Sequence, residues 1–469
     1  MGTVDMEPIA SCHVLAMPYP GRGHINPMMN LCKLVAGKSS SILITVVLTE
    51  EWLSLIGSED KPENIRFATV PNVVPSEHGR GADPRGFAMA VWSKMEEPFE
   101  RLLDELQLSP TLVIADSFIP WVADMACRRN IPFASLWPMS ATVFSVFYHF
   151  DLLVQHGHYP VNLSVNGDKI VDYIPGLSHI RVLDLPTIVR SQEDSELFVK
   201  ATSQAFHKAQ YLIFTSVYEL EAEVIDALKA KASFSIYTIG PATTYFKVKD
   251  VYSNMSNNIS DFNYLKWLNI QPPNSVLFIS LGSFLSVSKA QMDEIVAGLC
   301  ASGTRFLWVA RGERPNLEES CGEKGLVVPW CDQLSVLCHP SVGGFLSHCG
   351  WNSTKEATLA GVPMLTFPIL MDQVPNAKMI VEDWQIGWRV KREFEEGNLA
   401  KRDEIALLVQ RFMNLKSPER KQLEEKATKI QQVCEREFAD GGSFQDNLDG
   451  FTKSILQYHY NSNLATFQW

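Results

Sequence analysis

Short runs of consecutive apolar residues recur along the first half of the chain, and longer segments with helical spacing separate them. Each run is apolar throughout and does not alternate with polar residues, which is typical of parallel strands covered on both faces. The segments Pro27–Val35 and Trp121–Arg129 carry apolar residues at helical spacing. This alternation predicts a doubly wound α/β domain. Its predicted strands are Cys12–Met17, Ile42–Leu48, Ile65–Val70, Leu112–Ala115, Pro132–Leu136, Tyr211–Thr215 and Ile236–Ile239.

The same alternation restarts after a polar interruption. Gly240 and Pro241 are followed by a stretch without a core pattern that reaches Ser260, and such a stretch indicates an exposed linker. A chain of 469 residues also exceeds the usual size of one hydrophobic core, which favours two domains. The strands predicted beyond the linker are Val276–Leu281, Phe306–Val309, Leu326–Val328, Gly343–Leu346 and Met364–Phe367.

These patterns predict an α/β protein with two Rossmann-like, doubly wound domains that face each other across a cleft. Open parallel sheets bind ligands beyond the carboxyl ends of their strands, so both domains should present loops to that cleft. The predicted organisation is an N-terminal domain over 1–240, a linker over 241–260, a C-terminal domain over 261–443 and a helix over 444–469 that packs back on the N-terminal domain.

Composition leaves this picture unchanged but excludes several classes of partner. The chain is 46% hydrophobic and 20% charged, and its net charge of −12 comes without a basic stripe. We therefore expect no nucleic-acid or anionic-membrane partner. No apolar run approaches the roughly 18 residues of a membrane span, and the first residues show no secretion signal. We expect a monomer in the cytoplasm.

Cysteine and histidine spacing points away from a metal site. None of the nine cysteines forms a CxxC pair, and His156 and His158 form an HxH motif without an evident third ligand. No Asp-x-Asp occurs anywhere in the chain. Four cysteines lie within or beside apolar segments and are predicted to be buried free thiols: Cys12, Cys32, Cys300 and Cys349.

The most informative stretch runs from Trp330 to Gln373, 44 residues with both ends counted. Within it a predicted strand runs into Ser347–Thr354, and a helix follows. The free N–H groups of a helix start, with the positive end of its dipole, form a site for anions. Glu356 lies one turn into the helix, where its carboxylate could accept hydrogen bonds from two ribose hydroxyls. Trp330 offers a flat ring to a base, and such stacking contributes roughly 1–3 kcal/mol in nucleic-acid binders.

This stretch resembles the signature box of the plant family 1 UDP-glycosyltransferases in its length and at nearly all of its functional positions. The resemblance extends over the whole chain, from the start at Met17–Pro27 to Ser280–Ser283. It implies a GT-B fold, a UDP-sugar donor as co-substrate, no metal ion and inversion at the anomeric carbon. The implied acceptor is a small lipophilic hydroxylated molecule such as a flavonoid, phenol or terpenoid, and the sequence does not choose among these classes.

The resemblance also assigns the donor contacts. Trp330 would stack on uracil, Gln333 would lie beside the uracil and ribose, and Glu356 would hold the ribose hydroxyls. The residues assigned to the diphosphate are Ser283, His348, Asn352 and Ser353. The residues assigned to the sugar are Trp351, Asp372 and Gln373. Because Gln at the last position of the box usually accompanies glucose in this family, UDP-glucose is the expected donor.

Three positions depart from the family pattern, and one of them, Phe367 in place of a frequent Trp, is expected to be a packing change. Many members carry a Thr after Trp137 that reaches the donor sugar, whereas Pro138 stands there in this chain. Proline has neither a hydroxyl nor an N–H, so one sugar contact is missing or is made by Ser140 or Thr142 instead. Lys355 replaces a usual apolar residue on the predicted signature helix, and we expect it to face solvent.

The expected catalytic pair comes from the N-terminal half. A turn rich in glycine and proline places His24 just after the first predicted strand, and Asp116 follows the fourth predicted strand. A histidine oriented by a carboxylate is the arrangement needed to deprotonate an acceptor hydroxyl. From the residues alone, His24 could equally be a helix-capping histidine. The resemblance assigns His24 as the general base and Asp116 as its partner.

The acceptor pocket is expected in the N-terminal domain, although aromatic residues at helical spacing fit a core equally well. The candidate walls are Phe118, Trp121, Trp137, Phe144, Phe147 and Tyr148.

Two other functions are weighed against the transferase. A nicotinamide-dependent oxidoreductase would need a third glycine that Gly21–Asn26 lacks. A non-catalytic UDP-sugar-binding protein would be expected to lose His24 or Asp116, and both are present.

Overall fold

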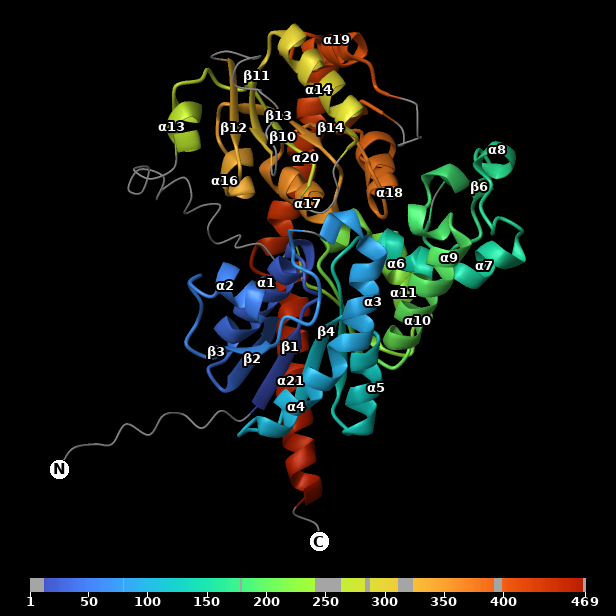
Figure 1. Cartoon of the computed structure of the whole chain (residues 1–469), viewed down its shortest axis with the longest axis vertical. Helices are drawn as coiled ribbons and strands as arrows, with labels where there is room; N and C mark the ends of the chain where they lie inside the picture. The colour runs from blue at the N-terminus through green and yellow to red at the C-terminus, as the bar shows by residue number, and fades with distance from the viewer. Residues whose placement is uncertain are drawn as a thin grey trace, which may run out of the picture.

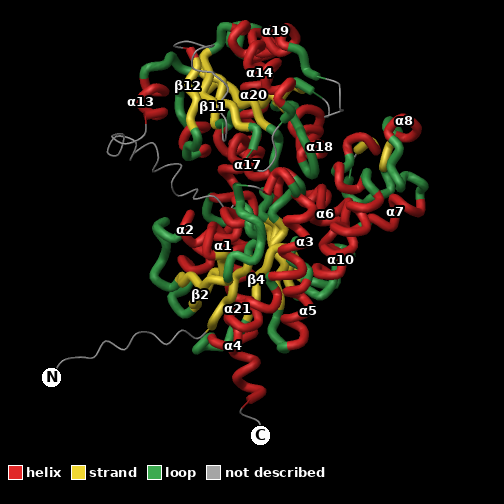
Figure 2. The backbone as a smooth tube through the Cα atoms, in the orientation of Figure 1, coloured by secondary structure: helices red, strands yellow, loops and turns green. Residues whose placement is uncertain are grey.

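The computed structural model describes residues 12–78, 80–177, 179–240, 263–282, 287–310, 324–391 and 399–466. These residues form two α/β domains, each built on its own parallel sheet with helices packed around it (Figures 1 and 2). This architecture confirms the predicted pair of Rossmann-like domains. Every predicted strand occurs, and its ends lie within one residue of those expected.

The N-terminal sheet has seven parallel strands in the order β3-β2-β1-β4-β5-β8-β9. Its central strands β1, β2, β4 and β5 are buried at every position, which explains why they are apolar throughout. The strands are β1 Cys12–Met17, β2 Ile42–Thr49, β3 Ile65–Val70, β4 Leu112–Asp116, β5 Phe133–Trp137, β8 Tyr211–Phe214 and β9 Ser235–Thr238.

Helices cover this sheet on both faces. The main ones are α1 Arg22–Lys38, α2 Glu50–Ile56, α3 Pro84–Lys94, α4 Glu96–Glu105, α5 Trp121–Arg128, α6 Ala141–Tyr148, α10 Lys200–Phe206 and α11 Ala222–Lys229. A lateral extension contains α7 Phe150–Gln155, α8 Leu163–Asn166, α9 Gln192–Asp194 and the short antiparallel pair β6 Ile170–Val171 and β7 Ile180–Arg181. The domain also contains the short 3₁₀-helices η1 Arg80–Ala82, η2 Val182–Asp184, η3 Thr187–Val189 and η5 Tyr218–Leu220, and the π-helix η4 Ser195–Val199. The two-residue strands β6 and β7 are too short to leave a periodic signal.

The C-terminal sheet has six parallel strands in the order β12-β11-β10-β13-β14-β15. Its strands are β10 Val276–Ser280, β11 Arg305–Val309, β12 Gly325–Val328, β13 Val342–Ser347, β14 Met364–Thr366 and β15 Gly387–Arg389. The pattern does not predict β15, because it is a three-residue edge strand with an arginine at its end. The helices of this domain are α13 Asn263–Asn269, α14 Lys289–Ser302, α16 Gln333–Leu337, α17 Trp351–Ala360, α18 Gln373–Lys378, η7 Met379–Asp383 and α19 Arg402–Phe412.

Two long helices connect the domains at the end of the chain. α20 Pro418–Phe438 descends from the C-terminal domain, and α21 Ser443–Thr466 continues along the N-terminal domain (Figure 1). Phe444, Leu448 and Phe451 of α21 belong to the same hydrophobic cluster as β1, β2 and α1. The backbone N–H of Thr238 also donates to Asn447 Oδ1 at 2.9 Å. The chain therefore crosses twice between the domains.

Cysteine burial follows the expectation at three of the four positions. Cys12, Cys32 and Cys349 are buried free thiols. Cys300 is half-buried and disulfide-bonded, so the expectation was wrong for this residue. Among the helices of the described ranges, none combines the length and the apolar character that a membrane crossing requires.

Candidate functional site

His24 and Asp116 meet at the carboxyl edge of the N-terminal sheet. His24 lies in the first turn of α1, just beyond β1, and Asp116 is the last residue of β4, which pairs with β1. His24 Nδ1 lies 2.8 Å from Asp116 Oδ2. A carboxylate accepts hydrogen bonds, so Nδ1 carries the proton and Nε2 is left with its lone pair. The imidazole is 25% exposed, whereas the carboxylate is fully buried.

The Asp116 carboxylate is itself held in place. Its second oxygen, Oδ1, accepts the backbone N–H of Phe118 at 2.9 Å. The Phe118 ring stands edge-on to the His24 ring at 5.9 Å, and Tyr19 lies on another side of it with ring centroids 4.9 Å apart. The histidine is thus oriented by a fixed carboxylate and by two aromatic rings. Sequence reasoning missed Tyr19, although its place between β1 and His24 was a usable signal.

A buried ion pair supports the loop that leads to His24. Arg80 pairs with Glu77 at 3.1 Å, and its Nη1 donates to the carbonyl oxygen of Pro20 at 3.5 Å. A Cβ atom on Gly21 would lie 1.7 Å from Arg80 Nη1. Glycine is therefore required at position 21 for the guanidinium to lie against the loop.

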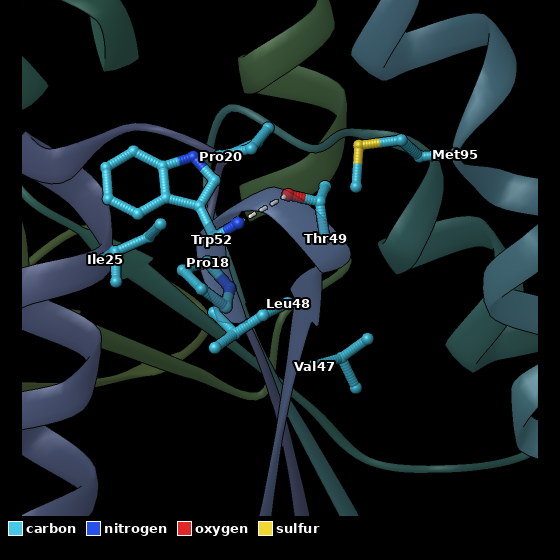
Figure 3. Close-up of a pocket in the computed structure, with 8 residues that line it drawn as sticks. All are labelled: Pro18, Pro20, Ile25, Val47, Leu48, Thr49, Trp52 and Met95. Atoms are coloured by element: carbon cyan, nitrogen blue, oxygen red, sulfur yellow. Dashed lines mark hydrogen bonds between the residues drawn. The ribbon is translucent and has the colours of Figure 1, made fainter. Parts of the chain in front are cut away.

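Side chains pack closely behind the same loop, as Figure 3 shows. They surround a small hollow whose lining is mostly apolar and which leaves no room for a ligand. The backbone N–H of Trp52 donates to Thr49 Oγ1 at 3.3 Å and so caps α2 at this point. We interpret this cluster as support for the loop. Its residues are Pro18, Pro20, Ile25, Val47, Leu48, Thr49, Trp52 and Met95.

The second half of the candidate site lies at the carboxyl edge of the C-terminal sheet. β13 ends at Ser347 and α17 begins at Trp351, with Gly350 as its N-cap and no side chain capping the helix. No acidic residue lies in the first turn, so the N–H groups and the dipole of α17 remain available to an anion.

The ring of His348 lies against two glycines, Gly350 of this turn and Gly282, which follows β10. A Cβ atom on Gly282 would lie 2.8 Å from His348 Nε2, and one on Gly350 would lie 2.4 Å from it. Desolvation lowers the pKa of His348 to about 4, so the ring is neutral near pH 7. Its Nδ1 has no hydrogen-bond partner within the described part of the chain. Cys349, which lies between His348 and Gly350 in the chain, has a φ of 65°, a left-handed conformation that is uncommon outside glycine.

Three residues of the signature stretch form one hydrogen-bonded group. Gln333 Nε2 donates to Ser353 Oγ at 2.9 Å and to Glu356 Oε2 at 2.7 Å. Burial raises the pKa of Glu356 to about 7, and the hydrogen bond from Gln333 opposes that rise. This group therefore joins the start of α16 to the first two turns of α17.

Asp372 and Gln373 lie at the start of α18. Asp372 Oδ2 accepts a hydrogen bond from Asn376 Nδ2 at 2.8 Å. Burial raises the pKa of Asp372 to about 6, while Asn376, the backbone of Trp351 and the nearby His24 oppose the rise. Gln373 Oε1 accepts the backbone N–H groups of Ile369 and Leu370 at 2.8 and 3.1 Å. This carbonyl is therefore occupied by the loop, and the amide nitrogen is the end that could contact a ligand.

The two tryptophans differ in exposure. Trp330 is 46% exposed, as a stacking surface would need to be. Trp351 is buried at the start of α17, and its indole N–H has no hydrogen-bond partner among the described residues. Ser283, the remaining residue that the resemblance assigned to the diphosphate, lies outside the described residues.

The two half-sites touch directly. Asn352 Nδ2, in the first turn of α17, donates to the carbonyl oxygen of Gly23 at 2.9 Å, next to His24. Asp372 is also close enough to His24 for the histidine to influence its pKa. The structure thus brings the predicted catalytic pair and the signature stretch together, although they lie more than 200 residues apart (position 116 against position 330).

The hydroxyls suggested as replacements at the Pro138 position are already engaged. Ser140 Oγ donates to Asn376 Oδ1 at 3.2 Å, and Thr142 Oγ1 contacts Met379 Sδ at 3.6 Å. Both bonds cross from the N-terminal to the C-terminal domain. In this structure, therefore, both hydroxyls take part in contacts between the domains.

The candidate acceptor walls are mostly core residues. Phe118 stacks on Trp137 within a single hydrophobic cluster, Trp137 meets its other aromatic neighbours edge-on, and Phe118 also reaches His24. Trp121 belongs to a different cluster and donates its indole N–H to Val91 O at 3.1 Å. The members of the first cluster are Phe118, Trp137, Phe144 and Phe147, with Tyr148 packed against them.

Lys355 does not face solvent, so that expectation was wrong. Its side chain is 3% exposed and points toward the N-terminal domain.

Within the described ranges, no three His, Cys, Asp or Glu side chains come together as metal ligands would.

Known proteins resemble this chain over nearly its full length. The family model described as "UDP-glucoronosyl and UDP-glucosyl transferase" matches residues 195–399. UDP-glycosyltransferase 87A1 of Arabidopsis thaliana is 47% identical over 94% of this chain and 100% of its own length. UDP-glycosyltransferase 87A2 of the same plant is 48% identical, over 94% and 96%. The crystal structure of Medicago truncatula UGT71G1 complexed with UDP-glucose shares the fold, with a TM-score of 0.80 over 95% of this chain and 98% of that one, at 23% identity.

Proposed function

Since the chain belongs to the plant family 1 UDP-glycosyltransferases, we propose that it transfers glucose from UDP-glucose to a hydroxyl group of a small lipophilic acceptor, such as a flavonoid, phenol or terpenoid. The transfer would need no metal ion and would invert the anomeric carbon. The observation that carries this proposal is the contact between the half-sites. Asn352 on the signature helix bonds to Gly23, beside a histidine that a buried carboxylate orients.

In this proposal His24 is the general base and Asp116 its partner. Nδ1 of His24 donates to Asp116, so Nε2 is the atom that takes the proton of the acceptor hydroxyl. The acceptor oxygen then attacks the anomeric carbon while UDP leaves from the opposite face. Asp116 holds the tautomer and stabilises the imidazolium that forms.

The donor would lie along the C-terminal domain. The exposed ring of Trp330 stacks on uracil, Gln333 lies beside the uracil and ribose, and Glu356 accepts from the ribose hydroxyls. The open start of α17, with its free N–H groups, faces the diphosphate and stabilises the charge that develops as UDP leaves. The side chains proposed for the diphosphate are His348, Asn352, Ser353 and Ser283, and those for the sugar are Trp351, Asp372 and Gln373.

In this proposal the two domains bind different substrates. We assign acceptor binding to residues 1–240, with Tyr19 and Phe118 beside the reacting hydroxyl because both rings contact His24. Donor binding belongs to residues 261–443, after a linker over 241–260. The helix over 444–469 returns to the first domain.

The test is incubation with UDP-glucose and a panel of hydroxylated acceptors, with products identified by mass spectrometry. A gain of one hexose that needs His24 supports the proposal. A non-catalytic UDP-sugar-binding protein would bind UDP in a calorimeter without forming product, and binding of NAD without UDP would favour an oxidoreductase. Product NMR gives the anomeric configuration, and retention would overturn the inverting mechanism.

A further inference from the structure

Lys355 is a buried cation on the helix that carries the proposed donor contacts. It follows Thr354 on α17 and precedes Glu356, and its Nζ reaches out of the C-terminal domain. Nζ donates to the carbonyl oxygen of Thr215 at 2.8 Å and to Thr215 Oγ1 at 3.0 Å. Thr215 directly follows β8, so this contact lies at the carboxyl edge of the N-terminal sheet.

Burying the side chain of Lys355 at this position costs free energy of folding. Removing an ammonium group from water costs free energy unless hydrogen bonds and opposite charges compensate. Burial lowers the pKa of Lys355 to about 7, and the charges of Glu356 and Glu221 oppose that change. An apolar side chain would fill the same space without this cost. The two hydrogen bonds to Thr215 therefore point to a specific use of the lysine.

On the N-terminal side of the contact, hydrogen bonds tie neighbouring segments together. Glu221 is buried and accepts the backbone N–H groups of Thr142 and Ala141 at 2.8 and 3.0 Å, which ties it to the start of α6. Ser216 Oγ also donates to the Glu221 carboxylate. Thr215, which accepts the hydrogen bonds of the lysine, is thus adjacent in the chain to a residue bonded to the buried carboxylate of Glu221, and both belong to the N-terminal domain.

This contact lies where the chain leaves the N-terminal domain. Gly240, at the end of that domain, packs so closely that a Cβ atom on it would lie 2.2 Å from the carbonyl carbon of Thr215. Beside it, Val217 forms a small hydrophobic cluster with Leu359 of α17 and Cys434 of α20. The lysine therefore lies beside the segments that connect the two domains.

Besides the apolar contact of Leu359, two side chains of α17 form hydrogen bonds with described residues of the N-terminal domain. Asn352 bonds to Gly23 beside His24, and Lys355 bonds to Thr215. The two residues are three positions apart and so share one face of the helix. Two attachments restrict rotation of the helix in a way that one attachment does not.

We propose that Lys355 is a positioning residue that holds the donor-binding helix α17 against Thr215, so that the anomeric carbon of a bound UDP-sugar lies at a fixed place relative to His24. The inference rests on the proposed function. Lys355 touches neither substrate nor reacting atoms. It acts through the relative position of the domains, to which transfer rates are sensitive, since a displacement of about 1 Å can cost about 100-fold in rate.

The first experiment compares Lys355→Met with the wild-type enzyme, using UDP-glucose and an acceptor that the wild type glucosylates. Methionine keeps an unbranched stem and removes the ammonium. We expect kcat to fall about tenfold or more. The Kd for UDP, measured at pH 8 where Glu356 is mostly ionised, should change less than about threefold, because the ammonium of Lys355 bonds to Thr215 and not to the nucleotide contacts. Lys421→Met, at an exposed position of α20, is the matched control and should leave both values unchanged.

The second experiment removes the partner. Thr215→Val deletes one of the two acceptors of the lysine, so kcat should fall about threefold, and Thr215→Ser should restore it. In the Lys355→Met background, Thr215→Val should have no further effect, because the two groups act as one unit. Rates are normalised to folded enzyme, which separates positioning from stability.

Three outcomes overturn the inference: an unchanged kcat in folded Lys355→Met, a loss confined to UDP affinity, or independent effects of the two substitutions in the double variant. If Lys355→Met does not fold, the kcat values of Thr215→Val and Thr215→Ser provide the test. Equal kcat for Thr215→Val and the wild-type enzyme then overturns the inference. Failure of the proposed function is distinguishable, because the wild-type enzyme would then form no glucosylated product although it binds UDP.

Discussion

His24 and His348 occupy similar places in the two domains and have different partners. Each lies just beyond the carboxyl end of a central strand and near the start of a helix whose N-cap is glycine. His24 donates to a buried carboxylate, which leaves Nε2 free to accept a proton. No carboxylate of the described residues bonds to His348, and desolvation lowers its pKa to about 4.

The difference shows that the partner of a histidine, more than its place in the fold, decides its chemistry. A neutral ring with a low pKa can donate a hydrogen bond to a diphosphate but cannot hold a proton taken from an acceptor. A ring with an aligned carboxylate stabilises the imidazolium and can act as a base. The following predictions test this contrast, from the largest expected effect to the smallest.

Replacing His24 by alanine should have the largest effect. Loss of a general base typically costs about 10²–10⁴-fold in rate, so kcat should fall by at least about 100-fold. The Kd for UDP, measured by calorimetry, should stay within about threefold of the wild-type value because His24 is outside the nucleotide contacts. Near-wild-type turnover would remove His24 from the proposed mechanism.

Replacing Asp116 by asparagine tests whether the partner makes the base. The amide keeps the size of the carboxylate but no longer stabilises an imidazolium, and it can stabilise the wrong tautomer of His24. We expect kcat to fall about 100-fold, with UDP affinity unchanged. Thermal unfolding of the same variant is the control, since Asp116 is buried and also accepts from Phe118. If Asp116→Asn were fully active, orientation by the carboxylate would be unnecessary.

Replacing His348 by alanine should give the opposite division between rate and binding. A hydrogen bond to a charged group contributes about 1.5–3 kcal/mol, so UDP affinity should fall about tenfold or more. In the presence of saturating UDP-glucose, kcat should fall less than in His24→Ala. A variant with normal UDP affinity would show that the ring does not contact the diphosphate.

The smallest effect concerns the pH dependence of UDP binding. Glu356 has a pKa of about 7 in the unliganded protein, so it is mostly protonated at pH 6 and mostly ionised at pH 8. Only the carboxylate can accept from two ribose hydroxyls, and UDP affinity should therefore rise by up to about tenfold between these values. His348 is neutral throughout this range and should contribute no pH dependence.

The variant Glu356→Gln isolates the contribution of Glu356 to the pH dependence of UDP binding. The variant should lose the part of the pH dependence that belongs to Glu356 and keep the part that comes from titration of UDP itself. Calorimetry at several pH values measures both, and identical profiles for the variant and the wild-type enzyme would contradict the assignment.

Much of the fold could be predicted from the chain because its signals are local. Runs that are apolar throughout mark strands buried on both faces, and the predicted strand ends lie within one residue of the observed ones. The pairing of strands at one sheet edge also explains why His24 and Asp116, 92 positions apart, could be expected to meet. The donor residues from Trp330 to Gln373 are carried by consecutive elements of one domain, so their grouping follows from local order.

Contacts between the domains left no such signal. Lys355 was expected to face solvent because lysine is rarely buried, yet the N-terminal domain covers it. Ser140 and Thr142 looked available to a sugar, but Asn376 and Met379 of the other domain engage them. Interfaces between independently folded surfaces follow no period of 2 or 3.6 residues, so only the assembled structure reveals them.

The sequence by itself determined two doubly wound domains, the order of their strands along the chain and the residues at each sheet edge, because each depends on periodicity and nearest neighbours. The tertiary structure decided how closely His24 approaches Asp116, how closely the half-sites approach each other, and that a lysine crosses between the domains. These features depend on packing between segments that lie far apart in the chain, where a displacement of an ångström changes a hydrogen bond into no contact.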